Sequence, residues 1–345
     1  MLNKLIKEYI TKILPLFVLL PFVGYGQDNH GGDRLFDEAG ALEIKLQTDL
    51  IQLLDNRHED PDEQEATLVI NDINGETKRF DVKVSSRGNF RRDSLNCDFP
   101  PLRLNFKKKE IVDTYFEGNE KIKLVTHCKT NVPEFDQFVV REYVTYRIYN
   151  VLTPISFQVR YATITYEDTQ NQLNPIKRIG FLIEDIDHLA ARNKMKEYED
   201  PLEVKDLEKR NEILLSLFQY MIGNTDWIVN MSKNLKTMSD GEAFYAVPYD
   251  FDYTLLVGTD YSLGGGNSIL SQPIREFRGL CYDLPDFNPV FEEFLTKRKE
   301  INTIIRKEKM LDYQSKQHMT DFLNIFYYII KSEKRIEENI FANCN

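Results

Sequence analysis

The stretch of sequence that decides the fold lies between residues 223 and 252. It begins Gly223-Asn224-Thr225-Asp226-Trp227, continues through Asn230 and Asn234, and ends Phe244-Tyr245-Ala246-Val247-Pro248-Tyr249-Asp250-Phe251-Asp252. Strand patterns at 235–238 and 244–249 flank a turn at Asp240-Gly241, so this segment predicts a short hairpin. Because a hairpin brings its two ends together, Asp226 and Asp250 are expected to face each other across a cleft.

This order of acids and amides is typical of phosphoryl-transfer sites. In such sites one carboxylate orients or deprotonates the attacking hydroxyl, while an Asn and a second carboxylate hold Mg²⁺ against the phosphates. Asp226 is the candidate catalytic residue. The candidate magnesium ligands are Asp250, Asn234 and Asp252, although Asp252 could instead orient the other ligands. Asn230 is an alternative to Asn234, and any one of these residues could simply cap a helix or form a turn.

The first 26 residues have the pattern of a secretory signal peptide. Lys4, Lys7 and Lys12 precede an apolar run at 13–23, and small residues follow that run. The run is shorter than the roughly twenty residues that span a bilayer, so no stable membrane insertion is expected. We therefore expect cleavage near Gly26-Gln27 and an exported protein, either periplasmic or extracellular.

Export bears on the cysteines, because an oxidising compartment permits disulfides. The chain has four, Cys97, Cys128, Cys281 and Cys344, which allow three pairings that sequence alone cannot distinguish. A Cys97–Cys128 bond is favoured because both residues lie in the strand-rich first half, and buried free thiols are the alternative. A zinc site is not expected, because no Cys-x-x-Cys motif occurs and His127 has no partner at ligand spacing.

Hydrophobic periodicity divides the chain into a signal peptide (1–26), a polar N-terminal segment (27–64), a β-rich part (65–185) and a mostly helical part that carries the acidic residues (186–345). Helical spacing predicts helices at 42–54, 138–152, 207–222, 290–304 and 318–340. Alternation predicts strands at 67–70, 79–84, 102–106, 121–126, 157–166 and 178–184, with Asn74-Gly75 turning between the first two. This order predicts an α+β, bilobal protein-kinase-like fold, with a β-rich N-terminal lobe and a mostly helical C-terminal lobe.

Four segments carry a resemblance to a known family. They are Ser86-Arg87-Gly88-Asn89 with Leu102-Arg103-Leu104-Asn105-Phe106, the helix at 140–152 with Arg141-Glu142, the strand Ile179-Gly180-Phe181-Leu182-Ile183-Glu184, and Asn224-Thr225-Asp226 with Asn234 and Pro248-Tyr249-Asp250-Phe251-Asp252. In these segments the chain resembles the spore coat protein CotH kinase-like family, a set of atypical protein kinases. The resemblance covers roughly residues 80–260. The chain departs from the family pattern at Phe99-Pro100-Pro101, where a lysine-rich stretch is usual, and at Phe181, which replaces a Tyr.

The resemblance implies ATP and Mg²⁺ as cofactors and suggests which residues hold them. Lys123 is expected to pair with Glu142 and so position the phosphates. Arg87 competes for this task, because a guanidinium grips phosphate with two hydrogen bonds. Glu184 and its strand are expected to line the adenine pocket, mainly through backbone groups. The simpler alternatives are an exposed strand lysine at 123 and a structural turn at 87–89, and Gly264-Gly265-Gly266 is expected to be a flexible loop.

We therefore expect an exported, ATP- and Mg²⁺-dependent kinase that phosphorylates Ser or Thr of a protein in the envelope or outside the cell. The alternative is a catalytically weak or inactive protein of the same fold that serves adhesion or assembly as a binding module. Phosphotransfer to a small molecule or sugar is a third hypothesis. The formal net charge of −11 argues against nucleic acid and anionic membranes as partners.

Overall fold

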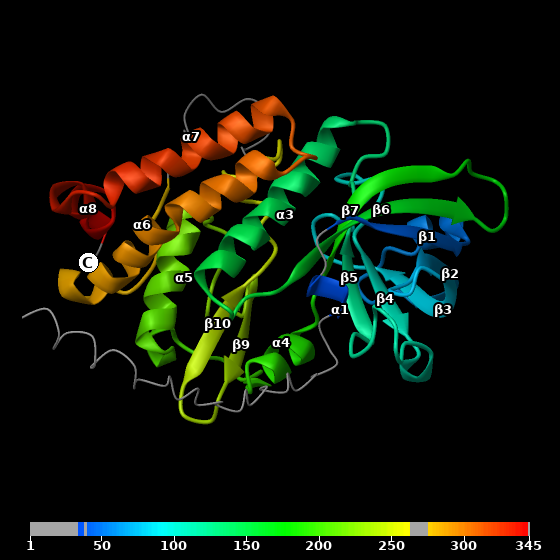
Figure 1. Cartoon of the computed structure of the whole chain (residues 1–345), viewed down its shortest axis with the longest axis horizontal. Helices are drawn as coiled ribbons and strands as arrows, with labels where there is room; N and C mark the ends of the chain where they lie inside the picture. Colours follow the sequence, from blue (N-terminus) through cyan, green and yellow to red (C-terminus); the bar gives the residue numbers. More distant parts are fainter. Residues whose placement is uncertain (1–33, 38–39, 263–274, 344–345) are drawn as a thin grey trace, which may run out of the picture. The chain divides into compact units, whose positions relative to one another are not determined.

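Strands from the first half of the chain close into a β-barrel (Figure 1). The computed structural model describes residues 34–37, 40–262 and 275–343, which belong to one compact unit. The barrel strands are β1 (Leu42–Thr48), β2 (Gln64–Asn71), β3 (Thr77–Ser86), β4 (Leu102–Phe106), β5 (Lys121–Val125), β6 (Val159–Asp168) and β7 (Ile176–Ile183). They are ordered β1-β2-β3-β4-β5-β7-β6, and β1 closes the ring by pairing parallel to β6, whereas the other neighbours are antiparallel.

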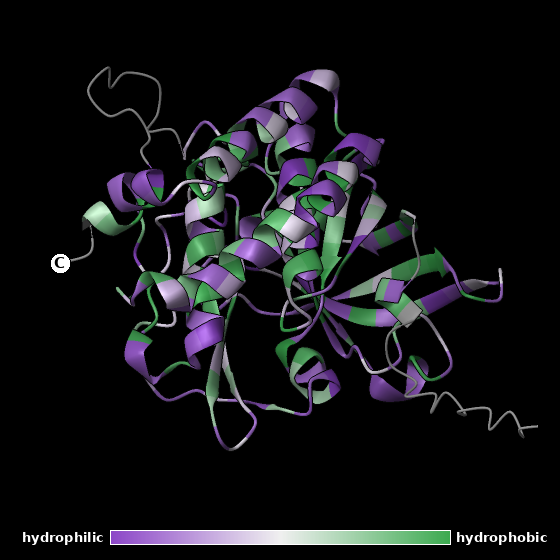
Figure 2. Ribbon diagram, turned by 60° about the vertical axis from the view of Figure 1, so that its left-hand side comes forward, coloured by the Kyte–Doolittle hydropathy of each residue, from purple (hydrophilic) through white to green (hydrophobic). Residues whose placement is uncertain are grey.

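Alternating side chains build the interior of the barrel. Successive residues of a strand point to opposite faces, and in β1 the residues Leu42, Ile44 and Leu46 are buried while their neighbours are more exposed. Figure 2 shows hydrophobic and hydrophilic residues interspersed along the strands in this way. The buried set forms one cluster with the inward residues of the other strands, among them Val82, Leu104 and Leu182.

The helix predicted at 42–54 is replaced by strand β1 and a short helix, α2 (Leu50–Asp55). Leu42, Ile44 and Leu46 alternate strictly with polar residues, which is the period of a strand, so the helix prediction was wrong for this part of the segment. Pairing with β2 and β6 stabilises residues 42–48 as a strand, since it supplies backbone hydrogen bonds on both edges of β1. Asp49 caps α2, and its side chain accepts a bond from the Gln52 N–H.

Helices pack against the outside of the barrel and against one another (Figure 1). The longer ones are α3 (Glu134–Leu152), α5 (Lys209–Ile222), α6 (Leu284–Lys307) and α7 (Tyr313–Ile329), and the shorter ones are α1 (Arg34–Asp37), α4 (Ile186–Arg192) and α8 (Glu333–Asn339). Three strands, β8 (Lys196–Glu197), β9 (Leu235–Ser239) and β10 (Phe244–Pro248), form a second sheet in the order β10-β9-β8. The predicted helix at 318–340 is therefore two helices, α7 and α8, with a break after Ile330.

The predicted bilobal protein-kinase-like fold is wrong. The β-rich part is a closed mixed barrel with its own core, and the rest consists of helices and a small separate sheet, which is not the two-lobe kinase arrangement. One continuous apolar cluster joins the outer face of the barrel, through Tyr161 and Phe181, to α3, α5 and α6. The barrel and the helices therefore share one hydrophobic core, whereas the predicted kinase-like fold would have two lobes.

A disulfide joins Cys97 to Cys128, as predicted, and both cysteines are buried. The bond ties the loop after β3 to the chain just beyond β5, beside a backbone bond from Phe99 N–H to the Cys128 carbonyl (2.9 Å). The predicted signal peptide and Gly264-Gly265-Gly266 lie outside the described residues. No helix in the described part of the chain is both long enough and apolar enough to cross a bilayer.

Candidate functional site

The end of α5 positions Asp226. Gly223 ends this helix in the left-handed conformation (φ 66°), and an added Cβ would lie 2.9 Å from Leu255 Cβ, so a glycine is required here. The next residue, Asn224, is buried, donates its amide to Gln219 (2.9 Å) and accepts the Asp226 N–H (2.9 Å). This buried amide fixes the backbone of Asp226 at the start of the loop that leads to β9.

The β9–β10 hairpin brings its two ends together, as its short length predicts. The Tyr249 N–H donates to the Asn234 carbonyl (3.1 Å), and the Asp250 N–H donates to the hydroxyl of Tyr146 on α3 (2.8 Å). Asn234 (φ 54°) and Asp250 (φ 62°) both have left-handed backbone conformations, which Asn and Asp adopt more readily than other residues except glycine.

The predicted acidic residues line one cavity of about 710 Å³, which we call the acidic cavity. Its lining residues are Arg87, Gly88, Asn89, Phe90, Arg91, Pro101, Asp226, Met231, Ser232, Lys233, Asn234, Tyr249, Asp250, Asp252 and Tyr253. Asp226, Asn234, Asp250 and Asp252 thus come together with Arg87. Asn230 is exposed and does not belong to this lining, which favours Asn234 over the alternative that the sequence left open.

Asp226 is held by two neighbours from the same loop. Lys233 forms an ion pair with one carboxylate oxygen. The Asn234 amide nitrogen donates to the other oxygen (2.9 Å) and to the Asp226 carbonyl (2.7 Å). Since both bonds use the amide nitrogen of Asn234, its amide oxygen is the atom that could bind a cation.

Asp252 is buried on the cavity wall, where the Tyr261 hydroxyl donates to it (2.9 Å). Burial, followed by the charge of Asp250, raises the pKa of Asp252 to about 7. Both causes disfavour a second negative charge at this point. A cation bound between these carboxylates would relieve the repulsion and return Asp252 to its ionised form.

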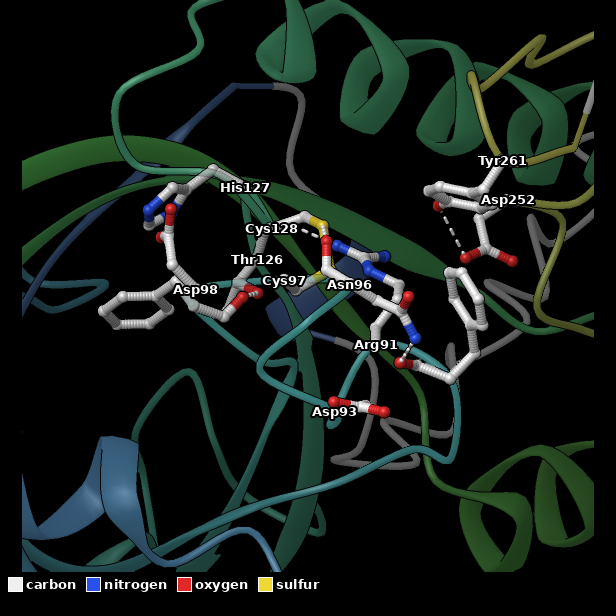
Figure 3. Close-up of a disulfide and its surroundings, with 12 residues drawn as sticks. Arg91, Asp93, Asn96, Cys97, Asp98, Thr126, His127, Cys128, Asp252 and Tyr261 are labelled. Atoms are coloured by element: carbon white, nitrogen blue, oxygen red, sulfur yellow. Dashed lines mark hydrogen bonds between the residues drawn. A yellow bond between two sulfur atoms is a disulfide. The ribbon is translucent and has the colours of Figure 1, made fainter. Parts of the chain in front are cut away.

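Arg91 supplies positive charge behind the acids. Its guanidinium lies 3.6 Å from the buried carboxylate of Glu142 and also donates to the Thr126 carbonyl. Figure 3 shows Arg91 between the disulfide and the Asp252–Tyr261 pair. Burial raises the pKa of Glu142, the charge of Asp252 adds to that rise, and Arg91 opposes it.

The predicted Lys123–Glu142 ion pair is therefore wrong, because Arg91 occupies the place beside Glu142. Lys123 lies on the outer face of β5, with its ammonium 5.2 Å from the Tyr249 ring centre and 5.6 Å from that of Phe157. Burial, followed by the charge of Arg87, lowers the pKa of Lys123 to about 8. It lines a separate cavity of about 360 Å³ with the side chains of Arg103, Asp185 and Lys236, among others.

Glu184 is held by hydrogen bonds inside the fold, and its expected place in an adenine pocket stays a prediction. Its side chain is fully buried and accepts hydrogen bonds from His188 Nδ1 (2.9 Å), Arg192 Nε (2.7 Å) and the Gln158 N–H (2.9 Å). These bonds join the end of β7 to α4 and to the start of β6. Glu184 does not line the acidic cavity.

The sequence did not indicate several residues in or beside the site, among them Arg91, Lys233 and Tyr261. Arg91 follows the Arg87-Gly88-Asn89 turn closely, so the same turn could have pointed to it. Lys233 is adjacent to Asn234. Its positive charge in the loop between Asp226 and β9 could have indicated an ion pair with Asp226. No local pattern indicates Tyr261, whose ring packs with Phe90 and Tyr253 at centroid distances of 4.9 and 5.1 Å.

The donor set fits magnesium in part. Asp250, Asp252 and Asn234 offer hard oxygen atoms, and the crowded charge at Asp252 favours a cation nearby. Over residues 34–37, 40–262 and 275–343 there is no group of three or more His, Cys, Asp or Glu side chains placed to hold a metal ion. A metal ion bound here would therefore need further ligands from outside these residues.

Comparison with known proteins adds no relative. No protein-family model matches the chain, and no curated protein matches it.

Proposed function

We propose that the acidic cavity binds ATP together with Mg²⁺ and transfers a phosphoryl group to a Ser or Thr hydroxyl of a protein outside the cytoplasm. The observation that carries this proposal is the meeting of Asp226, Asn234, Asp250 and Asp252 in one cavity of about 710 Å³. A cavity of that size accommodates a nucleotide-sized ligand. The resemblance to the CotH kinase-like family supports the proposal at the residues of the site, without the kinase fold.

Each residue has a chemical task in this proposal. Asp226 accepts a hydrogen bond from the acceptor hydroxyl and takes its proton, while Lys233 and Asn234 hold the carboxylate in position. Asp250, Asp252 and the Asn234 amide oxygen would hold Mg²⁺, which neutralises phosphate charge when bound. Arg87, which also lines the cavity, donates to phosphate oxygens.

A second candidate is a binding module without catalysis, serving adhesion or assembly. The ion pair between Lys233 and Asp226 favours it, because a carboxylate already neutralised by lysine is a weaker base. This candidate shares the cavity with the first but requires no phosphotransfer.

The test is the melting response of the purified chain to Mg²⁺ and ATP. Asp250 should be replaced by Asn, because Asn tolerates the left-handed conformation (φ 62°) that would strain Ala. At about one hundred times Kd, ligand binding stabilises the wild type by about 2.7 kcal/mol, and Asp250→Asn should lose most of that gain. The matched control is Asp260→Ala, since Asp260 is exposed in the same loop and does not line the cavity.

Transfer of labelled γ-phosphate to a Ser/Thr peptide library separates the two candidates. Transfer that disappears in Asp226→Asn supports the kinase. Stabilisation by Mg²⁺-ATP without transfer supports the binding module. If the wild type and Asp250→Asn respond equally to Mg²⁺-ATP, the acidic cavity does not hold the nucleotide and both versions of the proposal fail.

A further inference from the structure

A second cavity, of about 740 Å³, lies between α6 and α7, which run side by side as an antiparallel pair (Figure 1). We call it the α6–α7 groove. Its lining residues are Leu295, Thr296, Arg298, Lys299, Asn302, Thr303, Arg306, Tyr313, Lys316, Gln317 and Thr320. None of them lines the acidic cavity, so the groove is a separate site.

Helical spacing explains why these side chains meet. On α6 the lining residues recur every three or four positions from Leu295 to Arg306, and on α7 they recur in the same way from Tyr313 to Thr320. Residues with this spacing share one helical face. The eleven steps along the helix from Leu295 to Arg306, at 1.5 Å each, make the α6 wall about 16 Å long. The groove is therefore an elongated furrow.

The charge of the groove is entirely positive. Arg298, Lys299, Arg306 and Lys316 line it, and no carboxylate does, although the whole chain carries a net charge of −11. No described carboxylate lies within ion-pair distance of Lys299, Arg306 or Lys316. Three unneutralised cations along one furrow repel one another, so an anionic ligand would bind there favourably.

The remaining polar groups of the groove are uncharged hydrogen-bonding side chains. The Asn302 side-chain oxygen is buried and has no hydrogen-bond partner among the described residues. Arg298 is already held in position by Asn324 (2.9 Å) and by the ring of Tyr327. Gln317 donates to Asp321, one turn further along α7 (2.7 Å). A buried acceptor without a partner is costly and would be satisfied by an N–H from a ligand.

We propose that the α6–α7 groove binds an acidic polypeptide segment in an extended conformation. A furrow of about 16 Å matches about five residues of extended chain at 3.3 Å each. The cations would attract carboxylate side chains, and Asn302 and its neutral neighbours would meet backbone N–H and C=O groups. Tyr313, with 79% of its surface exposed, offers an apolar contact at one end. This proposal does not depend on phosphoryl transfer.

The test measures binding of fluorescein-labelled hexaglutamate by fluorescence anisotropy in low salt. The groove variant combines Lys299→Gln, Arg306→Gln and Lys316→Gln. The control variant combines Lys307→Gln, Lys309→Gln and Lys331→Gln, which remove the same charge from exposed positions outside the groove. We expect the groove variant to bind at least tenfold more weakly and the control variant to bind within twofold of the wild type.

Three results would overturn the proposal. The first is an equal loss of affinity in both variants, which means that only net charge matters. The second is wild-type binding of hexaglutamate no tighter than that of hexalysine. The third is binding of inorganic phosphate or of phosphatidylserine vesicles that is tighter than peptide binding and needs the same three cations. Matching melting temperatures of both variants show that the comparison concerns folded protein.

Discussion

Removing the Cys97–Cys128 disulfide should lower the free energy of unfolding by an amount that the loop length sets. The two cysteines are 31 residues apart in sequence and both are buried. The chain-entropy relation for a loop of this length gives about 12 cal/mol/K, which is about 3.7 kcal/mol at 25 °C. That is a large fraction of the stability of an ordinary domain.

The assay is urea unfolding of Cys97→Ala, Cys128→Ala and the double variant, each compared with the oxidised wild type. Either single substitution already opens the loop. We therefore expect each single variant to lose about 3–4 kcal/mol and the double variant to lose little more. This non-additivity distinguishes a cross-link from two independent packing contacts, whose losses would add. Measurements at mildly acidic pH keep the remaining thiol from exchanging.

Two outcomes contradict the reasoning. Losses that add between the single variants would mean that the cysteines contribute through packing alone. A loss below about 1 kcal/mol would mean that the reduced chain is already constrained in its unfolded state. The melting response to Mg²⁺-ATP in the same variants reports separately on the wall of the acidic cavity, because the disulfide anchors the loop that carries Arg91.

Two further predictions concern buried charge. Arg91→Met should lower the free energy of unfolding by about 3–5 kcal/mol, because it leaves Glu142 buried without its partner, and adding Glu142→Gln should recover part of that loss in urea unfolding. Burial, aided by Arg178 and Arg91, lowers the pKa of His127 to about 3, so below about pH 6.5 the unfolded state binds a proton that the folded state does not. His127 should therefore make the free energy of unfolding fall by up to about 1.4 kcal/mol for each pH unit of acidification. Between pH 6 and pH 4, a plot of that free energy against pH should be less steep for His127→Gln than for the wild type. Parallel plots would contradict this prediction.

Local patterns in the sequence predicted the elements that position the acidic cavity. Strand β4 has the predicted bounds, Leu102–Phe106, and the β9–β10 hairpin lies where the Asp240-Gly241 turn placed it. These features depend on neighbours a few residues away. Asn234 and Asp250 meet at the two ends of the short hairpin, and hydrogen bonds from Asn234 hold Asp226 beside them.

The errors arose where distant residues decide the structure. Glu142 selects Arg91 as its ion-pair partner because the disulfide-bonded loop carries Arg91 to α3, whereas Lys123 faces Tyr249. Barrel closure likewise depends on pairing between β1 and β6, so element order alone suggested two lobes.

The seam between β1 and β6 also has a consequence for the order of folding. Beside it, the Leu50 N–H donates to the side chain of Asp168 (3.1 Å), which is 118 residues further along the chain. A contact between residues so far apart in sequence forms late and slowly, because a long loop must close, at a cost in entropy, before strand pairing can stabilise the chain. Until β6 has been synthesised, β1 has an open edge that can pair with other chains. Strand β1 is therefore the part of this barrel most open to pairing with other chains while the protein is being synthesised.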